Sequence, residues 1–152
     1  MGMTELNNAY ELIKNNKGGF FKGQIDENII VKAENFLEIK FPKTYRFFLK
    51  QSGCGSFRSK EFYGISSNNF ENSSVPNGIW LTHDERKNGN LDKDLILIGQ
   101  SIEGYYALDT SKMDKNGECP VVDWYAGADR NNLEIIAEDF GIYFFNEINE
   151  II

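Results

Sequence analysis

The apolar positions between residues 26 and 52 follow a helical period twice, with Phe41-Pro42 between the two runs. Asp26 is a suitable cap for the first helix, whose apolar positions lie three or four residues apart: Ile29, Ile30, Ala33, Phe36 and Leu37. Pro42 suits the first position of the second helix, because its missing N–H is not needed there. That helix has its own apolar face: Tyr45, Phe48 and Leu49. The pattern therefore predicts two amphipathic helices packed on a core.

The rest of the chain predicts short strands between two terminal helices. Helical spacing is found at residues 6–13 and 133–148, and a short helix is expected at 78–86. Strands are expected at four places: 58–65, 94–99, 104–109 and 120–124. Residues 95–98 form an unbroken apolar run, which favours a strand covered on both faces. These elements predict one α+β domain over residues 1–152, with a mainly antiparallel sheet of about four to six strands, helices packed on one side and a C-terminal helix.

This order of elements resembles the SUKH superfamily, also called the Smi/Knr family. The resemblance is carried first by the joint and second helix, FPKTYRFFLKQSG at residues 41–53, where Phe41 replaces the family's usual Leu and Ser52 its usual Asn. Both departures are conservative for packing and turn geometry. Further along, GYYALDT at residues 104–110 and ECPVV at 118–122 are similar to the bacterial branch. The resemblance covers roughly residues 24–150.

The resemblance implies a non-catalytic domain that, in bacteria, most often acts as an immunity protein and neutralises a polymorphic toxin. We expect the partner to be a cognate protein toxin, a basic nuclease domain, held by stoichiometric occlusion. The alternative is a cytoplasmic regulatory or scaffold module for protein interactions, as the eukaryotic relatives imply. Because a fold does not by itself define a function, the residues must support either role independently.

Charge is distributed unevenly along the chain. Residues 1–52 carry 8 Lys or Arg and 6 Asp or Glu, whereas residues 53–152 carry 8 and 17, within a total net charge of −7. Acidic surface repels nucleic acid and steers a basic partner, although it also serves solubility. We therefore expect a basic protein partner and no direct nucleic-acid binding. No apolar run is long enough for a membrane span and the N-terminus lacks the features of a signal peptide, so we expect a cytoplasmic monomer or weak homodimer that binds no membrane.

Candidate catalytic, cofactor and metal motifs are incomplete. The single histidine, His83, has no His or Cys at ligand spacing, so the sequence predicts neither a zinc site nor a cysteine nucleophile with its base. Gly53-Cys54-Gly55 follows a helix and lacks the Gly-Lys-Ser/Thr ending of a phosphate-binding loop. Cys54 and Cys119 are expected to be reduced thiols. We therefore expect no enzyme activity and no cofactor.

Aromatic and acidic residues on the predicted strands form a candidate partner surface. Adjacent aromatic residues occur at Tyr105-Tyr106 and Trp124-Tyr125, and strand alternation sends the two members of each pair to opposite faces. Exposed aromatics with acids beside them are typical of protein interfaces, although helices or loops that cover both faces would make these residues core. The predicted partner-binding residues are Glu103, Tyr105, Asp109, Asp123, Trp124 and Asp129.

Overall fold

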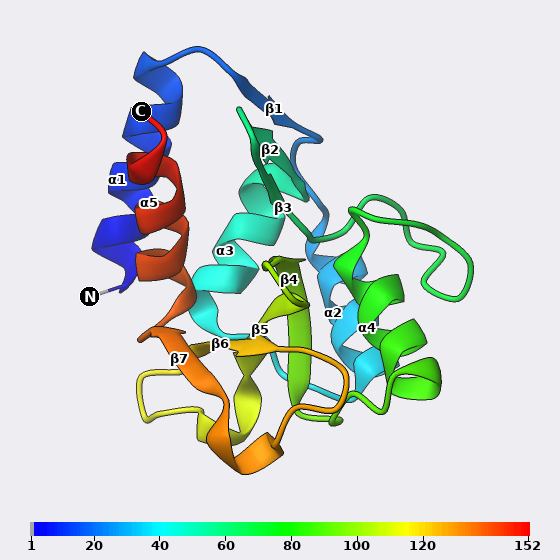
Figure 1. Cartoon of the computed structure of the whole chain (residues 1–152). Helices are drawn as coiled ribbons and strands as arrows, with labels where there is room; N and C mark the ends of the chain where they lie inside the picture. The colour runs from blue at the N-terminus through cyan, green and yellow to red at the C-terminus, as the bar shows by residue number, and fades with distance from the viewer. Residues whose placement is uncertain (1) are drawn as a thin grey trace.

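The computed structural model describes residues 2–152 as five α-helices, seven strands and two short 3₁₀ turns (Figure 1). The α-helices are α1 (Gly2–Asn15), α2 (Glu27–Leu37), α3 (Lys43–Ser52), α4 (Gly78–Asn88) and α5 (Phe140–Glu150). The strands are β1 (Gly19–Phe21), β2 (Gly55–Phe57), β3 (Lys60–Phe62), β4 (Leu95–Gln100), β5 (Tyr105–Asp109), β6 (Val121–Trp124) and β7 (Glu134–Ala137). The 3₁₀ turns are η1 (Thr110–Lys112) and η2 (Arg130–Asn132).

The strands form two antiparallel sheets. One has the order β1-β2-β3 and the other the order β4-β5-β6-β7. The sheets are joined where the chain leaves β3, because the N–H of Tyr63 donates to the carbonyl of Ile98 on β4 at 2.9 Å. A mixed α+β domain with antiparallel sheets and a C-terminal helix is thus confirmed.

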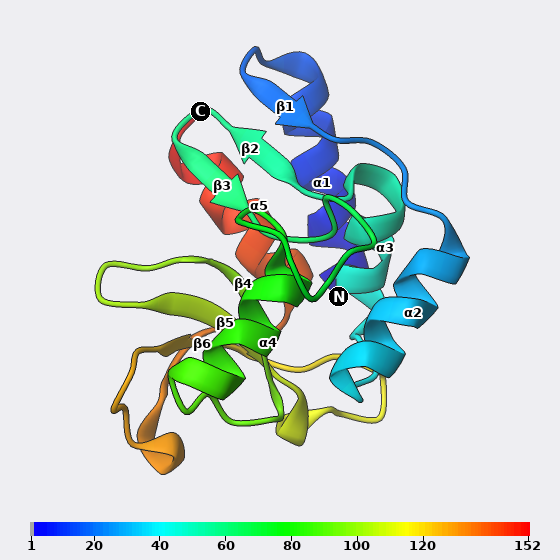
Figure 2. The same cartoon turned by 90° about the vertical axis from the view of Figure 1, so that its right-hand side faces the viewer.

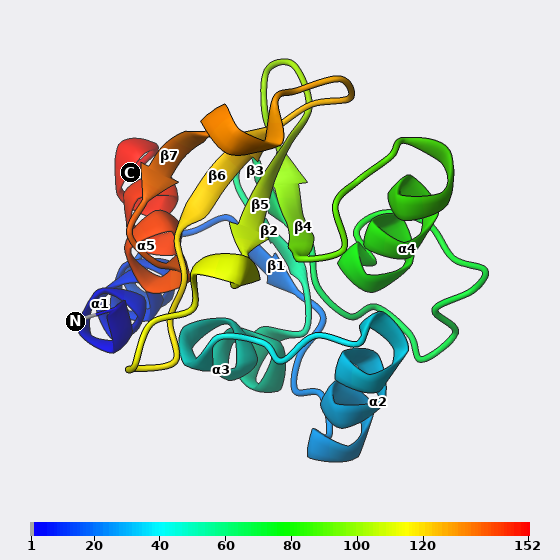
Figure 3. The same ribbon diagram turned by 90° about the horizontal axis from the view of Figure 1, so that it is seen from below.

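Two apolar clusters lie on opposite faces of the four-stranded sheet. The larger one packs the inner faces of α1, α3 and α5 against Ile96, Ile98, Leu108 and Val121. The smaller one packs α4, through Leu81, against Leu95, Leu97, Ala107, Val122 and Trp124. Residues 95–98 are completely buried, which confirms that this run is covered on both faces. Figure 3 shows α5 and α4 on opposite sides of the sheet, so helices cover both of its faces and not one side only.

The predicted helix pair forms as α2 and α3, with small differences at the caps. Asp26 is the N-cap of α2, but its side chain makes no capping hydrogen bond among the described residues. Pro42 is the N-cap of α3 and not its first residue. At the N-terminus of α3, the hydrogen-bond acceptor is a side chain distant in sequence. The carboxylate of Glu118 accepts hydrogen bonds from the N–H of Thr44 at 3.0 Å and from the Thr44 hydroxyl at 2.8 Å.

Two predicted elements differ from the structure. The helix expected at 133–148 is strand β7 followed by α5, because Asp139 caps α5 by accepting a hydrogen bond from the N–H of Ile142 at 2.9 Å. The strand expected at 58–65 is shorter in the structure, where it is β3 at residues 60–62; the chain turns into it at Arg58, a residue with a φ of 55°, from strand β2, which was not predicted. Strand β1 was not predicted from the sequence.

Candidate partner-binding site

The turn between β4 and β5, residues 101–104, projects from the sheet beside the segment that joins β6 to β7 (Figures 2 and 3). Ile102 at its tip is fully exposed. The turn is held by Ser101, whose N–H donates to the carbonyl of Gly104 at 3.0 Å and whose Oγ accepts from the N–H of Gly104 at 3.1 Å. A side chain at Gly104 would meet the carbonyl of Trp124, so glycine lets the hairpin lie close to β6.

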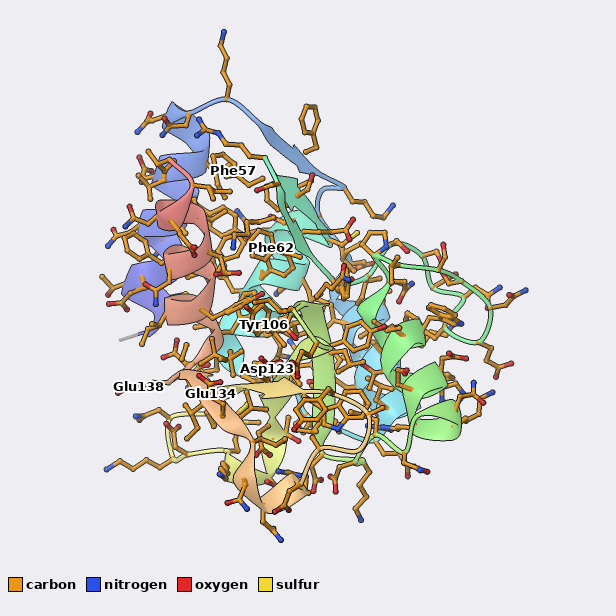
Figure 4. The ribbon with its side chains drawn as sticks, viewed as in Figure 1. Phe57, Phe62, Tyr106, Asp123, Glu134 and Glu138 are labelled. Atoms are coloured by element: carbon orange, nitrogen blue, oxygen red, sulfur yellow. The ribbon has the colours of Figure 1, made fainter. Side chains whose placement is uncertain are left out.

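An acid-lined cavity of about 500 Å³ lies on one side of this turn, and we call it the acidic cavity. Its lining residues are Ile102, Glu103, Asp123, Tyr125, Ala128, Asp129, Asn132, Leu133 and Glu134. Four of them are carboxylates, and no Lys or Arg contributes from the described part of the chain. Asp123 on β6 lies directly opposite Glu134 on β7 (Figure 4). Like charges at such positions destabilise a sheet, and the hydrogen bond that Ser101 Oγ donates to Asp123 at 2.7 Å gives only partial compensation.

A second cavity of about 440 Å³ lies on the other side of the turn, and we call it the aromatic cavity. Its lining residues are Tyr63, Val75, Glu85, Gln100, Ser101, Ile102, Glu103, Gly104, Tyr105, Trp124 and Ala126. Tyr105 on β5 lies opposite Trp124 on β6, and their rings stack at 6.4 Å with 17° between the planes. Tyr63 lies 6.5 Å from Tyr105 at 59°. The two cavities share Ile102 and Glu103.

Five of the six predicted partner-binding residues line these two cavities. Glu103 borders both, Tyr105 and Trp124 line the aromatic cavity, and Asp123 and Asp129 line the acidic cavity. Trp124 is only 5% exposed, so it forms a wall of the cavity and does not project from the surface. The expected alternation holds for its pair, because the neighbouring Tyr125 is 43% exposed.

Asp109 does not belong to this surface. It is 1% exposed and forms two hydrogen bonds with the guanidinium of Arg130, at 2.8 and 3.1 Å, and a third with the hydroxyl of Ser111 at 2.6 Å. Burial raises the pKa of this carboxyl, but the bonds from Arg130 and Ser111 outweigh that effect and lower it overall. Asp109 therefore fixes the end of β5 to the β6–β7 segment, which corrects its expected role in partner binding.

Several residues of this site were not identified from the sequence. Ile102 and Tyr125 are exposed apolar neighbours of predicted residues, and alternation indicated that one of Trp124 and Tyr125 is exposed without identifying which. Glu134 was placed in a helix, so its position opposite Asp123 could not be foreseen. Glu85 comes from α4, and only tertiary packing brings it beside Tyr105. Glu134 and Glu85 therefore join the site through strand pairing and tertiary packing, which the local sequence pattern does not predict.

His83 and the two cysteines, the other candidates for chemistry, are packed against or buried among other side chains. The imidazole of His83 packs 4.6 Å from the ring of Phe36, and Cys54 and Cys119 are both buried free thiols whose pKa burial raises. Within residues 2–152, no cluster of three or more His, Cys, Asp or Glu side chains has the arrangement of a metal site. Over the same residues, none of the helices has the length and apolar character needed to cross a membrane.

The chain was compared with known protein families. The SUKH_5 family model, described as SMI1-KNR4 cell-wall, matches residues 3–149 of the 152-residue chain. The match begins in α1 and ends in α5, so it includes both sheets and both cavities. It also extends the resemblance of residues 24–150 to the N-terminal helix. The chain therefore belongs to the SUKH superfamily.

Proposed function

We propose that this protein is an immunity protein that binds a basic nuclease toxin one to one and occludes its nucleic-acid site. The observation that carries the proposal is the acidic cavity, in which Asp123 and Glu134 lie side by side with Glu103 and Asp129 and no basic residue from the described chain. In this proposal the site acts by binding alone, without a catalytic step.

The physical argument begins with uncompensated charge. Two carboxylates opposite each other on neighbouring strands cost stability in the free protein, and a cationic partner would remove that cost on binding. A nuclease must present Lys or Arg side chains to hold phosphates, because phosphate contacts dominate nucleic-acid affinity. A cluster of carboxylates can occupy the same side chains and exclude the substrate.

The surroundings of the cavity add the apolar part of an interface. Ile102 is fully exposed at the tip of the turn, and Tyr125 is 43% exposed. Protein interfaces typically combine a few such apolar anchors with a polar rim. The proposed interface is therefore centred on the β4–β5 turn, with the acids of the cavity beside it.

The test is co-expression with the toxin domain encoded by the neighbouring upstream reading frame. We expect the protein to restore growth and to elute with that domain as a one-to-one complex. The double variant Asp123→Lys, Glu134→Lys should lose both effects while remaining folded. Glu11→Lys is the matched control, because Glu11 is an exposed acid on α1, outside both cavities.

Failure to restore growth or to form the complex would overturn the proposal. If the chain instead forms a stable complex with a non-toxic protein encoded beside it, the regulatory or scaffold role becomes the better interpretation. If the double variant protects as well as the parent, binding to a toxin would stand but the acidic cavity would not be its site.

A further inference from the structure

The aromatic cavity has the chemistry of a site for a cation. Its walls include the stacked rings of Tyr105 and Trp124 and the ring of Tyr63. The faces of tyrosine and tryptophan rings carry negative potential and attract ammonium and guanidinium groups. Because Tyr105 is half-buried, a group entering the cavity would exchange water for an aromatic surface.

Two carboxylates line the same cavity. Glu103 is exposed at its rim, and Glu85 enters from α4. One oxygen of Glu85, Oε2, is buried and accepts no hydrogen bond from residues 2–152. This oxygen lies beside Gly89, which does not line the cavity, so it is the negative charge of Glu85 and Glu103 that favours a cation there. No Lys or Arg of the described chain lines the cavity to supply one.

We infer that the aromatic cavity receives one arginine side chain of the partner protein, with the guanidinium against Tyr105 and Trp124 and hydrogen-bonded to Glu85. A guanidinium is planar, stacks on aromatic rings and has five donors that match a carboxylate, whereas an ammonium acts as a point charge. The inference rests on the proposed function for the source of the arginine, since the rim residues Ile102 and Glu103 also border the acidic cavity.

An anion or an apolar group would fit the chemistry of the aromatic cavity less well than a cation. An anion would meet Glu85 and Glu103 without compensation, and a purely apolar group would leave both carboxylates without a cation. Burial and the nearby Asp84 already raise the pKa of Glu85. Burial, Glu85 and Asp84 likewise raise the pKa of Tyr105, so negative charge is concentrated beside the ring. A bound cation would oppose both shifts.

The first arm of the test uses the protein alone, titrated with N-acetyl-arginine amide at constant ionic strength. Binding is followed by the fluorescence of Trp124 in a Trp80→Phe background, which leaves a single tryptophan, and by amide chemical shifts. We expect saturable binding in the millimolar range, about what a fragment of this size achieves. Glu85→Gln should weaken it roughly tenfold, because a charge-assisted hydrogen bond is lost. Glu134→Gln, in the acidic cavity, should leave it unchanged.

N-acetyl-lysine amide should bind more weakly than the arginine compound, and N-acetyl-glutamine amide should not bind. Absence of saturable binding, or equal binding by the Glu85→Gln protein, would overturn the inference. Thermal unfolding of each variant ensures that the loss is not a loss of fold. Because this arm contains no toxin, its failure leaves the proposed function standing.

The second arm uses the complex with the co-expressed toxin domain. Glu85→Gln and Tyr105→Phe should weaken the complex by different amounts, roughly tenfold and less than threefold, because the ring face is kept in the second variant. If the arginine compound binds but the toxin affinity is the same in Glu85→Gln, the cavity takes a free guanidinium compound and the partner-arginine inference is wrong. If no toxin is bound at all while the first arm succeeds, only the proposed function and the arginine's source fail.

Discussion

At the scale of single residues, the core depends on a cluster of aromatic rings around Phe48. Its side chain is completely buried, and its ring centroid lies 5.3 Å from those of Phe140 and Phe144 and 6.1 Å from that of Tyr45. These rings come from α3 and α5. Phe48 is therefore a point at which two helices distant in sequence are packed together.

Truncation of Phe48 should test this role. Phe48→Ala is expected to lower the free energy of unfolding by about 3 to 5 kcal/mol, because it removes buried apolar surface and leaves a cavity among rigid rings. Urea unfolding followed by circular dichroism measures the change. Phe20→Ala is the control, since Phe20 is 76% exposed and its loss should change stability little. Equal effects of the two substitutions would contradict the proposed packing.

The sequence predicts buried residues well where helical spacing is clear. Tyr45, Phe48 and Leu49 were expected on one apolar face and are all completely buried. For Trp124 and Tyr125, alternation predicts that one is exposed but not which one. The choice depends on α4, whose Leu81 packs in the same cluster as Trp124, and sequence spacing alone does not contain that contact.

At the scale of elements, Arg46 connects α2 and α3. Its guanidinium binds Glu34 at 3.0 and 3.1 Å and Glu27 at 2.8 and 3.2 Å. Glu34 is 4% exposed and also accepts the N–H of Phe41 at 2.8 Å. The joint between the two helices is thus fixed by a charged network as well as by apolar contacts.

Arg46→Ala should destabilise the protein by about 2 to 4 kcal/mol at pH 7, because it leaves the buried Glu34 without its cation. The hydrogen bonds from Arg46, and then from Lys50, lower the pKa of Glu27 to about 2. The stability that Glu27 contributes is therefore present above its unfolded pKa of about 4.5 and is lost as the pH falls towards 2.

The difference between the parent and Arg46→Ala should accordingly be larger at pH 7 than at pH 3. Urea unfolding at the two pH values measures it. Lys50→Ala is the control, because Lys50 is 52% exposed and its salt bridge, among residues 2–152, is with Glu27, whose side chain is 44% exposed. A difference that does not change with pH would show that Arg46 stabilises the joint by packing alone.

Strand β7 was predicted as part of a helix. Ile136, Phe140 and Phe144 have the four-residue spacing of a helix, which led to one helix over residues 133–148. Antiparallel pairing with β6 overrides that local preference for residues 134–137. Gly141 had the appearance of a weak point within a helix, but a side chain there would meet the backbone of Gly2, so it permits the close packing of α1 on α5.

At the scale of the whole molecule, the fold gathers acidic residues from separate parts of the chain at one site. The excess of acids in residues 53–152 was evident from the sequence. Their gathering around one turn follows from the order β4-β5-β6-β7, which brings Glu103, Asp123 and Glu134 from three parts of the chain into one cavity. An acidic composition alone does not show whether the carboxylates keep the protein soluble or bind a partner. Their concentration in one cavity favours partner binding.

Such a surface should steer a basic partner over a distance. The association rate with the toxin domain should fall steeply between low and physiological salt, while the dissociation rate changes less. Glu103→Lys, Asp123→Lys and Asp129→Lys should each slow association without unfolding the protein, and Tyr105→Ala should mainly speed dissociation. Trp124→Ala is unsuitable as an interface probe, because Trp124 is 5% exposed and its loss should destabilise the sheet.

Stopped-flow kinetics at several salt concentrations measures both rates, with Glu11→Lys on α1 as the control for a change in net charge alone. A reversal at Glu11 should slow association less than one at Glu103, since local potential at the contact matters more than total charge. If all four reversals have the same effect, long-range net charge is sufficient and the cavity has no special part. If none has an effect, the acids serve solubility and the partner binds elsewhere, on the basic N-terminal helices.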